Sequence, residues 1–187
     1  MKTFVVMAAA LAAAGAQAAG YHVYVGTYTG GSSQGIYLLE WNGESEKLTV
    51  RGLAAEVDNP SFLAKHPTLP VLYAVGELGD GGGAISAFRI DGDSGLLTLM
   101  NRQSSMGDGP CHVAVAPNGR HVALANYGGG SVAVYPIGED GSLGESSAFV
   151  QHTGSGPNEQ RQKAPHGHAV YFDPASRFLY AVDLGID

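Results

Sequence analysis

The sequence is poor in the residues that characterise several common classes of protein. It contains a single cysteine, Cys111, so no disulfide can form within the chain. Only 10 of the 187 residues are lysine or arginine, these are scattered, and the formal net charge is −7. Sparse, dispersed positive charge of this kind argues against nucleic acid as a partner.

The one long apolar run lies at the N-terminus. Lys2 precedes apolar and small residues from Phe4 to Ala14, a run shorter than the roughly 20 residues of a membrane-spanning helix. Ala16 and Ala18 then supply the small side chains that signal peptidase requires, and no cysteine follows that could carry a lipid. The pattern predicts a signal peptide over residues 1–18, cleavage after Ala18, and a periplasmic or secreted protein without a membrane anchor.

Glycine, by contrast, is abundant, and no long helical periodicity is present. The sequence contains 28 glycines, and two clusters of them, at residues 79–83 and 128–130, lie between short runs rich in Val, Ile, Tyr and Phe. Glycine turns between short β-branched and aromatic runs are typical of strands joined by hairpins. We therefore expect an all-β fold.

A repeat of about fifty residues runs through the chain. Residues 60–67, 110–117 and 167–174 align, and each ends in a proline, at 67, 117 and 174, giving offsets of 50 and 57 residues. A second strand follows at residues 71–75, 121–125 and 178–182, a third at 84–90 and 131–137, and a fourth begins at Leu96 and Leu143. Four antiparallel strands per repeat are typical of a β-propeller blade.

The repeat predicts the domain organisation. A partial β-propeller occupies residues 19–187, with blades at about 21–58, 59–108 and 109–152 and an incomplete blade at 165–187. The runs at 21–28, 36–41 and 47–57 match the second, third and fourth strands of a blade, so we expect the first strand to come from the other end of a longer chain. The sequence is thus interpreted as a truncated product or partial gene record, whose C-terminal half completes the ring.

One face of the predicted disc gathers polar residues. In an antiparallel pair the start of the first strand lies beside the end of the second, and the first strand of a blade is the innermost. Polar clusters beside a central channel are the default candidates for a site. Six candidates fall at this edge: Glu77, Asn126, Tyr127, His166, His168 and Asp183.

A long connection enters the same face. The seven extra residues of the last repeat fall within residues 152–164, which carry Asn158, Arg161, Gln162 and Lys163 just before His166. Long connections that interrupt a regular repeat often carry function. The two cations would suit an anionic or oxyanion-bearing ligand.

The residues alone leave several roles open. His166 and His168, two apart on one strand, suit general acid–base chemistry, structural hydrogen bonding or metal binding. Asp183, Glu77 and Asn126 could equally cap turns. Cys111 is expected to be a small buried hydrophobe, and the direction of its neighbour His112 is not fixed by the pattern.

Several motifs together resemble a known family. They are Val25-Gly26-Thr27-Tyr28-Thr29, Leu72-Tyr73-Ala74-Val75, Asn126-Tyr127-Gly128-Gly129-Gly130-Ser131-Val132, Arg161-Gln162 before Pro165-His166-Gly167-His168, and Asp183-Leu184-Gly185-x-Asp187. In this order they are similar to the propeller-type 6-phosphogluconolactonases and their lactonase relatives. The resemblance implies a seven-bladed propeller, of which about three blades are present, and hydrolysis of a cyclic sugar ester without metal or other cofactor.

The resemblance also implies roles for the candidate residues. Arg161 would bind a phosphate, a carboxylate or the developing oxyanion, and His166 or His168 would activate water against the lactone carbonyl. Asp183 and Glu77 would orient the histidines or sugar hydroxyls. The expected substrate-binding set is completed by Asn126, Tyr127 and Gln162.

Export complicates the choice of substrate. The 6-phosphogluconolactone intermediate is cytoplasmic, so an exported member of this family would act on another small-molecule lactone. The alternative is a non-catalytic propeller that binds a sugar, a peptide or a partner protein across the same face, because propellers serve many functions.

Overall fold

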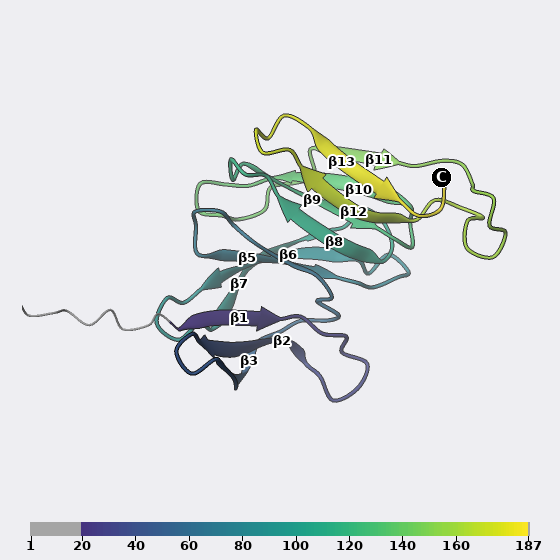
Figure 1. Ribbon diagram of the computed structural model, residues 1–187. Helices are drawn as coiled ribbons and strands as arrows, with labels where there is room; N and C mark the ends of the chain where they lie inside the picture. Colours follow the sequence, from purple (N-terminus) through teal and green to yellow (C-terminus); the bar gives the residue numbers. More distant parts are fainter. Residues whose placement is uncertain (1–19, 187) are drawn as a thin grey trace, which may run out of the picture.

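The computed structural model describes residues 20–186, and within this range every regular element is a β-strand (Figure 1). The thirteen strands of this range form four antiparallel sheets. The first contains β1 (Tyr21–Val25), β2 (Gly35–Asn42) and β3 (Lys47–Glu56). The second contains β4 (Leu63–Lys65), β5 (Val71–Gly76), β6 (Ala84–Ile90) and β7 (Leu97–Ser104).

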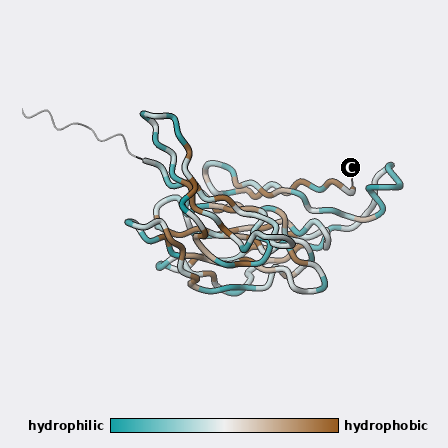
Figure 2. Tube along the Cα trace, turned by 90° about the horizontal axis from the view of Figure 1, so that it is seen from below, coloured by the Kyte–Doolittle hydropathy of each residue, from teal (hydrophilic) through white to brown (hydrophobic). Residues whose placement is uncertain are grey.

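The last two sheets continue the same pattern. The third contains β8 (Pro110–Val115), β9 (His121–Asn126), β10 (Ser131–Pro136) and β11 (Ala148–Gln151), and the fourth contains β12 (Gly167–Phe172) and β13 (Leu179–Asp183). Strands are adjacent in the sheets in the order in which they follow in the chain, so each sheet is a simple meander. In Figure 2 the hydrophobic segments lie mainly in the interior of the molecule, and the loops at its periphery are mainly hydrophilic.

Neighbouring sheets pack face to face because the second strand of each blade is apolar on both sides. Along β5, Val71, Tyr73 and Val75 enter a core shared with the third sheet. The intervening Leu72 and Ala74 enter a core shared with the first sheet. This alternation follows from the period of two along a strand, and it links three sheets through one element.

A tyrosine strengthens two of these interfaces. The Tyr73 hydroxyl donates to the carbonyl of Gly141, 2.8 Å away in the turn before the last strand of the next blade. Tyr24, at the corresponding position of the first blade, donates to the carbonyl of Gly95 in the equivalent turn at 2.7 Å. Tyr180 occupies this position in β13, and its side chain is 57% exposed.

The turns on the opposite face bring adjacent blades close together. Gly119 has a left-handed φ of 72°, and a Cβ there would lie 2.7 Å from the ring of His66. The His66 ring is in turn 3.0 Å from the carbonyl oxygen of Gly119. Glycine at this position therefore satisfies both the turn and the contact between the second and third blades.

The fourth strand of the third blade differs from the prediction. It was expected to begin at Leu143, but Leu143 forms only an isolated bridge with Ile137, and β11 begins at Ala148. The next residue in the register is Pro136, which has no N–H to offer the ladder. Ser146 and Ser147 instead donate their hydroxyl groups to the carbonyl of Val134.

The predicted signal peptide, residues 1–18, lies outside the described residues. Among the residues that the structure does describe, no helix has the length and apolar character needed to cross a membrane.

The tyrosine contact gives a matched test of the packing. Tyr73→Phe should lower the free energy of unfolding by about 1–3 kcal/mol, because the Gly141 carbonyl loses its partner in a buried interface. In the 187-residue chain, where Tyr180 occupies the same repeat position but is exposed, Tyr180→Phe should change it by less than about 0.5 kcal/mol. Urea unfolding followed by circular dichroism measures both. Equal effects of the two substitutions would refute the role of the buried hydrogen bond.

Candidate active site

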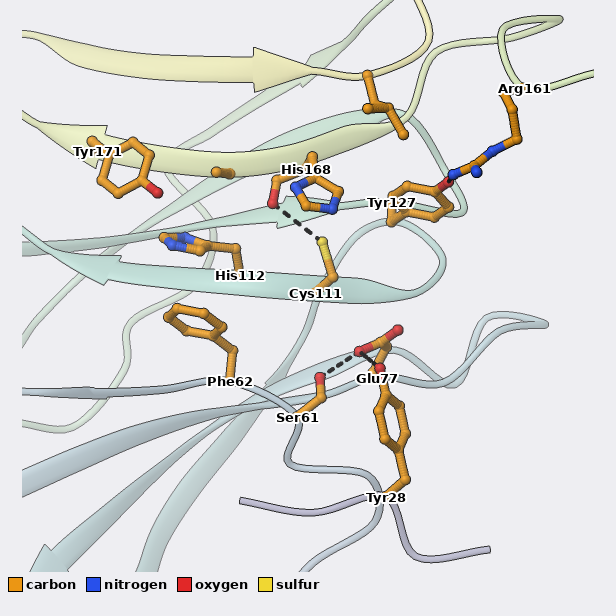
Figure 3. Close-up of a pocket in the computed structure, with 12 residues that line it drawn as sticks. Tyr28, Ser61, Phe62, Glu77, Cys111, His112, Tyr127, Arg161, His168 and Tyr171 are labelled. Atoms are coloured by element: carbon orange, nitrogen blue, oxygen red, sulfur yellow. Dashed lines mark hydrogen bonds between the residues drawn. The ribbon is translucent and has the colours of Figure 1, made fainter. Parts of the chain in front are cut away.

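A cavity of about 560 Å³ opens where the predicted polar edge lies (Figure 3). It is bordered by the starts of the inner strands, the ends of the second strands and the long connection before β12. Its lining residues are Tyr28, Ser61, Phe62, Glu77, Cys111, His112, Tyr127, Arg161, His168, Ala169, Tyr171 and Leu184.

Most of the lining comes from three positions of the repeat. One position supplies Ser61, Cys111 and His168, the next supplies Phe62, His112 and Ala169, and a third supplies Tyr28, Glu77, Tyr127 and Leu184. The second, third and fourth blades thus present the same three positions to the same space, with different side chains. The cavity is built by the repeat, and its chemistry is set by the residues that vary within it.

Irregular pairing turns two of these side chains into the cavity. The register of β8 with β9 shifts between Pro110 and His112, and that of β12 with β13 shifts between Gly167 and Ala169. The residues skipped by the ladders are Cys111 and His168, and both line the cavity. Bulges of this type redirect a side chain out of the ordinary alternation.

A carboxylate receives two hydroxyl groups on one side of the cavity. The Tyr28 hydroxyl donates to Oε2 of Glu77 at 2.8 Å, and the Ser61 hydroxyl donates to the same oxygen. The hydrogen bond to Glu77 raises the pKa of Tyr28, with smaller contributions from burial and from the charge of Glu77. Glu77 and these two partners come from three separate segments, which Figure 3 shows converging from the first and second blades.

A cation and two aromatic rings form the facing side. A terminal guanidinium nitrogen of Arg161 lies 3.4 Å from the Tyr127 hydroxyl. The ring of Tyr127 stands edge-on to the imidazole of His168, with centroids 5.8 Å apart. Arg161 and His168 are both exposed, so both can meet a ligand in the cavity.

The structure separates the two histidines of the Pro165-His166-Gly167-His168 motif. His166 is absent from the cavity lining; its Nδ1 lies 3.0 Å from the backbone oxygen of Tyr127, and its ring stacks on the Tyr127 ring at 4.6 Å. His168 lines the cavity. His166 therefore holds Tyr127 in place, while His168 faces the ligand space.

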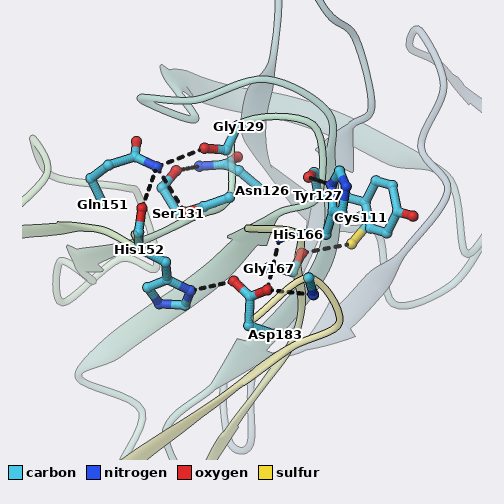
Figure 4. Close-up of polar contacts among 12 residues, drawn as sticks. Cys111, Asn126, Tyr127, Gly129, Ser131, Gln151, His152, His166, Gly167 and Asp183 are labelled. Carbon is cyan, nitrogen blue, oxygen red and sulfur yellow. Dashed lines mark hydrogen bonds and ion pairs between the residues drawn. The ribbon is translucent and has the colours of Figure 1, made fainter. Parts of the chain in front are cut away.

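Asp183 lies behind this wall (Figure 4). Its Oδ1 accepts the N–H groups of His166 and Gly185, both at 2.8 Å, and its Oδ2 lies 2.5 Å from Nδ1 of His152. Burial alone would raise the pKa of the Asp183 carboxyl, but these hydrogen bonds outweigh it and lower the pKa below its usual range. Asp183 anchors the His166 segment and does not line the cavity.

Aromatic groups form the remaining side of the cavity. The imidazole of His112 lies between the rings of Phe62, at a centroid distance of 4.1 Å, and Tyr171, at 5.1 Å. Its Nδ1 accepts the N–H of Val170 at 3.4 Å. Burial, and next the nearby His168, lower the pKa of His112, so its ring is neutral at pH 7 and carries its proton on Nε2.

Cys111 differs from the expectation of a buried hydrophobe. It is only half-buried, and it lines the cavity between the two polar sides. Burial, and next the charge of Glu77, raise the pKa of its thiol to about 11. The thiol is therefore protonated at neutral pH and is a poor nucleophile.

Two other predicted residues lie away from the cavity. Asn126 is fully buried, and its amide donates to the carbonyl of Ser105 at 3.0 Å and to the hydroxyl of Ser131 at 2.9 Å, which fixes it in the blade and leaves it no route to a substrate. The Gln162 amide donates to the carbonyl of Leu184 at 3.0 Å, which ties the long connection to the end of β13. The expectation of substrate contact is thus corrected for Asn126. It stays a prediction for Gln162, which borders a smaller pocket together with Arg161 and Leu184.

Sequence reasoning missed several lining residues, namely Tyr28, Ser61, Phe62, His112 and Tyr171. The repeat alignment contained the signal for Ser61, because it aligns with His168, and for Phe62 and His112, because they share the next position. Tyr28 carried a similar signal, because it follows Tyr24 by four residues as Glu77 follows Tyr73, and it therefore shares the position of Glu77. Tyr171 lies at another position, so the alignment could not single it out. Within the described residues, no group of three or more His, Cys, Asp or Glu side chains could hold a metal ion.

Comparison with known proteins decides the family. The profile of the family described as lactonase, seven-bladed β-propeller, matches residues 22–187. The chain belongs to this lactonase family. Lactonase relatives include a 6-phosphogluconolactonase of Bacillus subtilis, 45% identical over 167 residues, which are 89% of this chain and 47% of the relative. A 6-phosphogluconolactonase of Formosa agariphila is 30% identical, over 88% of this chain and 47% of the relative.

Solved structures agree with this assignment. The periplasmic gluconolactonase of Pseudomonas aeruginosa matches with a TM-score of 0.82 and 34% identity, over 90% of this chain and 48% of that one. The chain thus spans about half the length of the lactonases it matches. The predicted all-β propeller of four-stranded antiparallel blades, and the resemblance to the propeller-type lactonases, are confirmed.

The Asp183 network gives a pH-dependent prediction. Because the folded-state pKa of Asp183 is lowered, its contribution to stability is present above about pH 4, the unfolded value, and is lost as the pH falls through the folded value. Asp183→Asn should therefore lower the free energy of unfolding by about 1–3 kcal/mol at pH 7. The difference from the native protein should shrink toward pH 3.

Urea unfolding at a series of pH values measures this difference. Glu139→Gln, an exposed carboxylate in a turn on the opposite face, serves as the control and should leave stability unchanged. A deficit of Asp183→Asn that stays constant from pH 7 to pH 3 would contradict the charge-dependent role of Asp183.

Proposed function

We propose that this protein is a lactonase that hydrolyses a cyclic sugar ester, with His168 as the general base and Arg161 as the group that binds negative charge. The observation that carries the proposal is that a histidine and an arginine face one cavity across the ring of Tyr127. A base that activates water and a cation that stabilises the developing oxyanion both assist the hydrolysis of an ester.

The proposed reaction proceeds by attack of water on the lactone carbonyl. His168 takes a proton from the water as its oxygen bonds to the carbonyl carbon, and Arg161 stabilises the negative oxygen of the tetrahedral intermediate. The bond from that carbon to the ring oxygen then breaks, and the protonated His168 returns its proton to the leaving oxygen. The product is an open-chain hydroxy acid, which releases one proton at neutral pH.

The opposite side of the cavity suits the hydroxyl groups of a sugar. Glu77 offers carboxylate oxygens as acceptors, and Tyr28 and Ser61 are already gathered around it. The relatives support this substrate class, since they are named as a 6-phosphogluconolactonase and a gluconolactonase. A phosphorylated lactone would place its phosphate against Arg161, and a plain sugar lactone would leave Arg161 for the oxyanion alone.

Further blades of this protein complete the ring in our proposal. The outer face of β13 carries Tyr180 and Val182, each about half exposed, where the matching residues of β5 and β9 are buried. An apolar sheet face of this kind fits the face of another blade.

Hydrolysis of a lactone panel tests the function. Initial rates by pH release, on phosphorylated and plain sugar lactones, should fall about 10²–10⁴-fold in His168→Ala. Arg161→Ala should cost about 10²–10³-fold if it stabilises the oxyanion.

Two matched histidines serve as controls. His121→Ala, on the exposed opposite edge, should leave the rates unchanged. His166→Ala should reduce the rates less than His168→Ala does, because it removes only the ring that stacks on Tyr127. Turnover that survives His168→Ala would contradict its role as the base. No turnover on any lactone, with a folded propeller, would favour a module that binds a ligand on this face without chemistry.

We also propose that the protein is exported and cleaved after Ala18, as the N-terminal pattern predicts. The similar gluconolactonase of Pseudomonas aeruginosa is periplasmic, which supports this proposal. Mass spectrometry of the mature protein should find Ala19 as its first residue, in the periplasmic fraction or the medium. Ala18→Arg should block cleavage, and an uncleaved native protein confined to the cytoplasm would contradict export.

A further inference from the structure

Asn59 lies beside the candidate site without lining it. It stands between β3 and β4, and its φ of 43° is in the left-handed region. Asparagine tolerates this region better than most residues do, because its short amide can hydrogen-bond nearby backbone groups.

The side chain of Asn59 joins two segments. Its Oδ1 accepts the N–H of Thr29 at 2.8 Å and the Thr29 hydroxyl at 3.0 Å, and its Nδ2 donates to the carbonyl of Glu77 at 3.2 Å. Its own N–H donates to the Thr29 hydroxyl at 3.2 Å. A single amide therefore fixes the segments that carry Tyr28 and Glu77 relative to each other.

The backbone of Asn59 adds a third segment. Its carbonyl oxygen accepts the N–H of Ser61 at 2.8 Å and the N–H of Glu77 at 3.0 Å. Ser61, Tyr28 and Glu77 are the three residues whose polar groups meet at one carboxylate oxygen in the cavity. Asn59 therefore holds the backbone of Ser61 and Glu77 directly, and it holds Tyr28 through its hydrogen bonds with the adjacent Thr29.

Comparison of the blades distinguishes the role of the Asn59 backbone from the role of its side chain. Gly109 and His166 occupy the position of Asn59 in the next two blades, and their carbonyls accept the N–H groups of Tyr127 at 2.8 Å and Leu184 at 2.9 Å. The backbone bond therefore forms without an asparagine, and Gly109 does so with a left-handed φ of 59°. Asn59→Gly should keep this backbone arrangement and remove only the amide.

We propose that Asn59 is a positioning residue, whose amide sets the place of the Glu77 carboxylate and the Tyr28 hydroxyl in the cavity. Its effect on catalysis rests on the proposed function, but its effect on the geometry of the site does not. Cys111, the only cysteine in the chain, reports that geometry because it lies in the same cavity and the charge of Glu77 raises the pKa of its thiol.

The experiment is alkylation of Cys111 by iodoacetamide across a pH series, read by mass spectrometry. The midpoint of the rate profile reports the thiol pKa, and the plateau at high pH reports access to the thiol. Asn59→Gly should lower the midpoint, so that the rate near pH 9 rises up to about tenfold for a shift of one pH unit. Glu77→Gln, which removes the charge directly, should shift the midpoint in the same direction.

The controls separate this role from a general loss of structure. Asn118→Gly removes an asparagine amide from a turn on the opposite face, where its Oδ1 accepts the N–H of Arg120 at 2.9 Å, and it should leave the midpoint unchanged. A native midpoint in Asn59→Gly, with Glu77→Gln shifted, would overturn the proposal. A higher alkylation plateau in Asn59→Gly with an unchanged midpoint would also overturn the proposal. The Cys111 thiol would then be more accessible, but the Glu77 carboxylate would not have moved.

The kinetics of a lactone that the protein hydrolyses provide a second test of the proposal. Asn59→Gly should raise KM about tenfold with a smaller change in kcat, because it misplaces groups that bind sugar hydroxyls and leaves His168 and Arg161 in place. Asn59→Asp retains the acceptor for Thr29 and should recover part of this loss. If no lactone is hydrolysed the proposed function fails, yet the alkylation profile still decides the role of Asn59.

Discussion

The structure depends on apolar strands that are buried on both faces. β5 and β9 each place alternate residues into two different cores, so every interior blade is held by both of its neighbours. A strand of this kind is stable only between two sheets, because either face alone would expose apolar area to water. The radial arrangement of blades, and with it the common face that holds the cavity, follows from this constraint.

The cavity is formed by small departures from the repeat. Pairing irregularities at Cys111 and His168 turn these side chains out of the alternation of their strands, and the long connection before β12 brings Arg161 over them. Behind this layer, Asp183, His166 and Asn59 hold backbone segments by hydrogen bonds. The side chains that line the cavity and the groups that hold their backbone segments therefore lie in two successive layers of the same edge.

Sequence reasoning predicted the face but not the direction of each side chain. Glu77, Tyr127, His168 and Arg161 were placed on the correct edge, and all four line the cavity. Asn126 was placed there too, but it lies one residue before Tyr127 at the end of β9 and points into the packed blade. A difference of one residue along a strand reverses the side chain, and a pattern of polar residues cannot show which of two neighbours faces inward.

The sequence by itself determined the repeat, the strand pairing within blades, the family resemblance and the edge at which the candidate site lies. These follow from local signals, namely apolar alternation, glycine turns and fixed spacing. Only the tertiary structure decided that His168 faces the cavity while His166 supports Tyr127, and that Tyr28 and Ser61 join Glu77. These contacts connect residues distant in the chain, so their geometry depends on how blades pack and on where a ladder skips a residue.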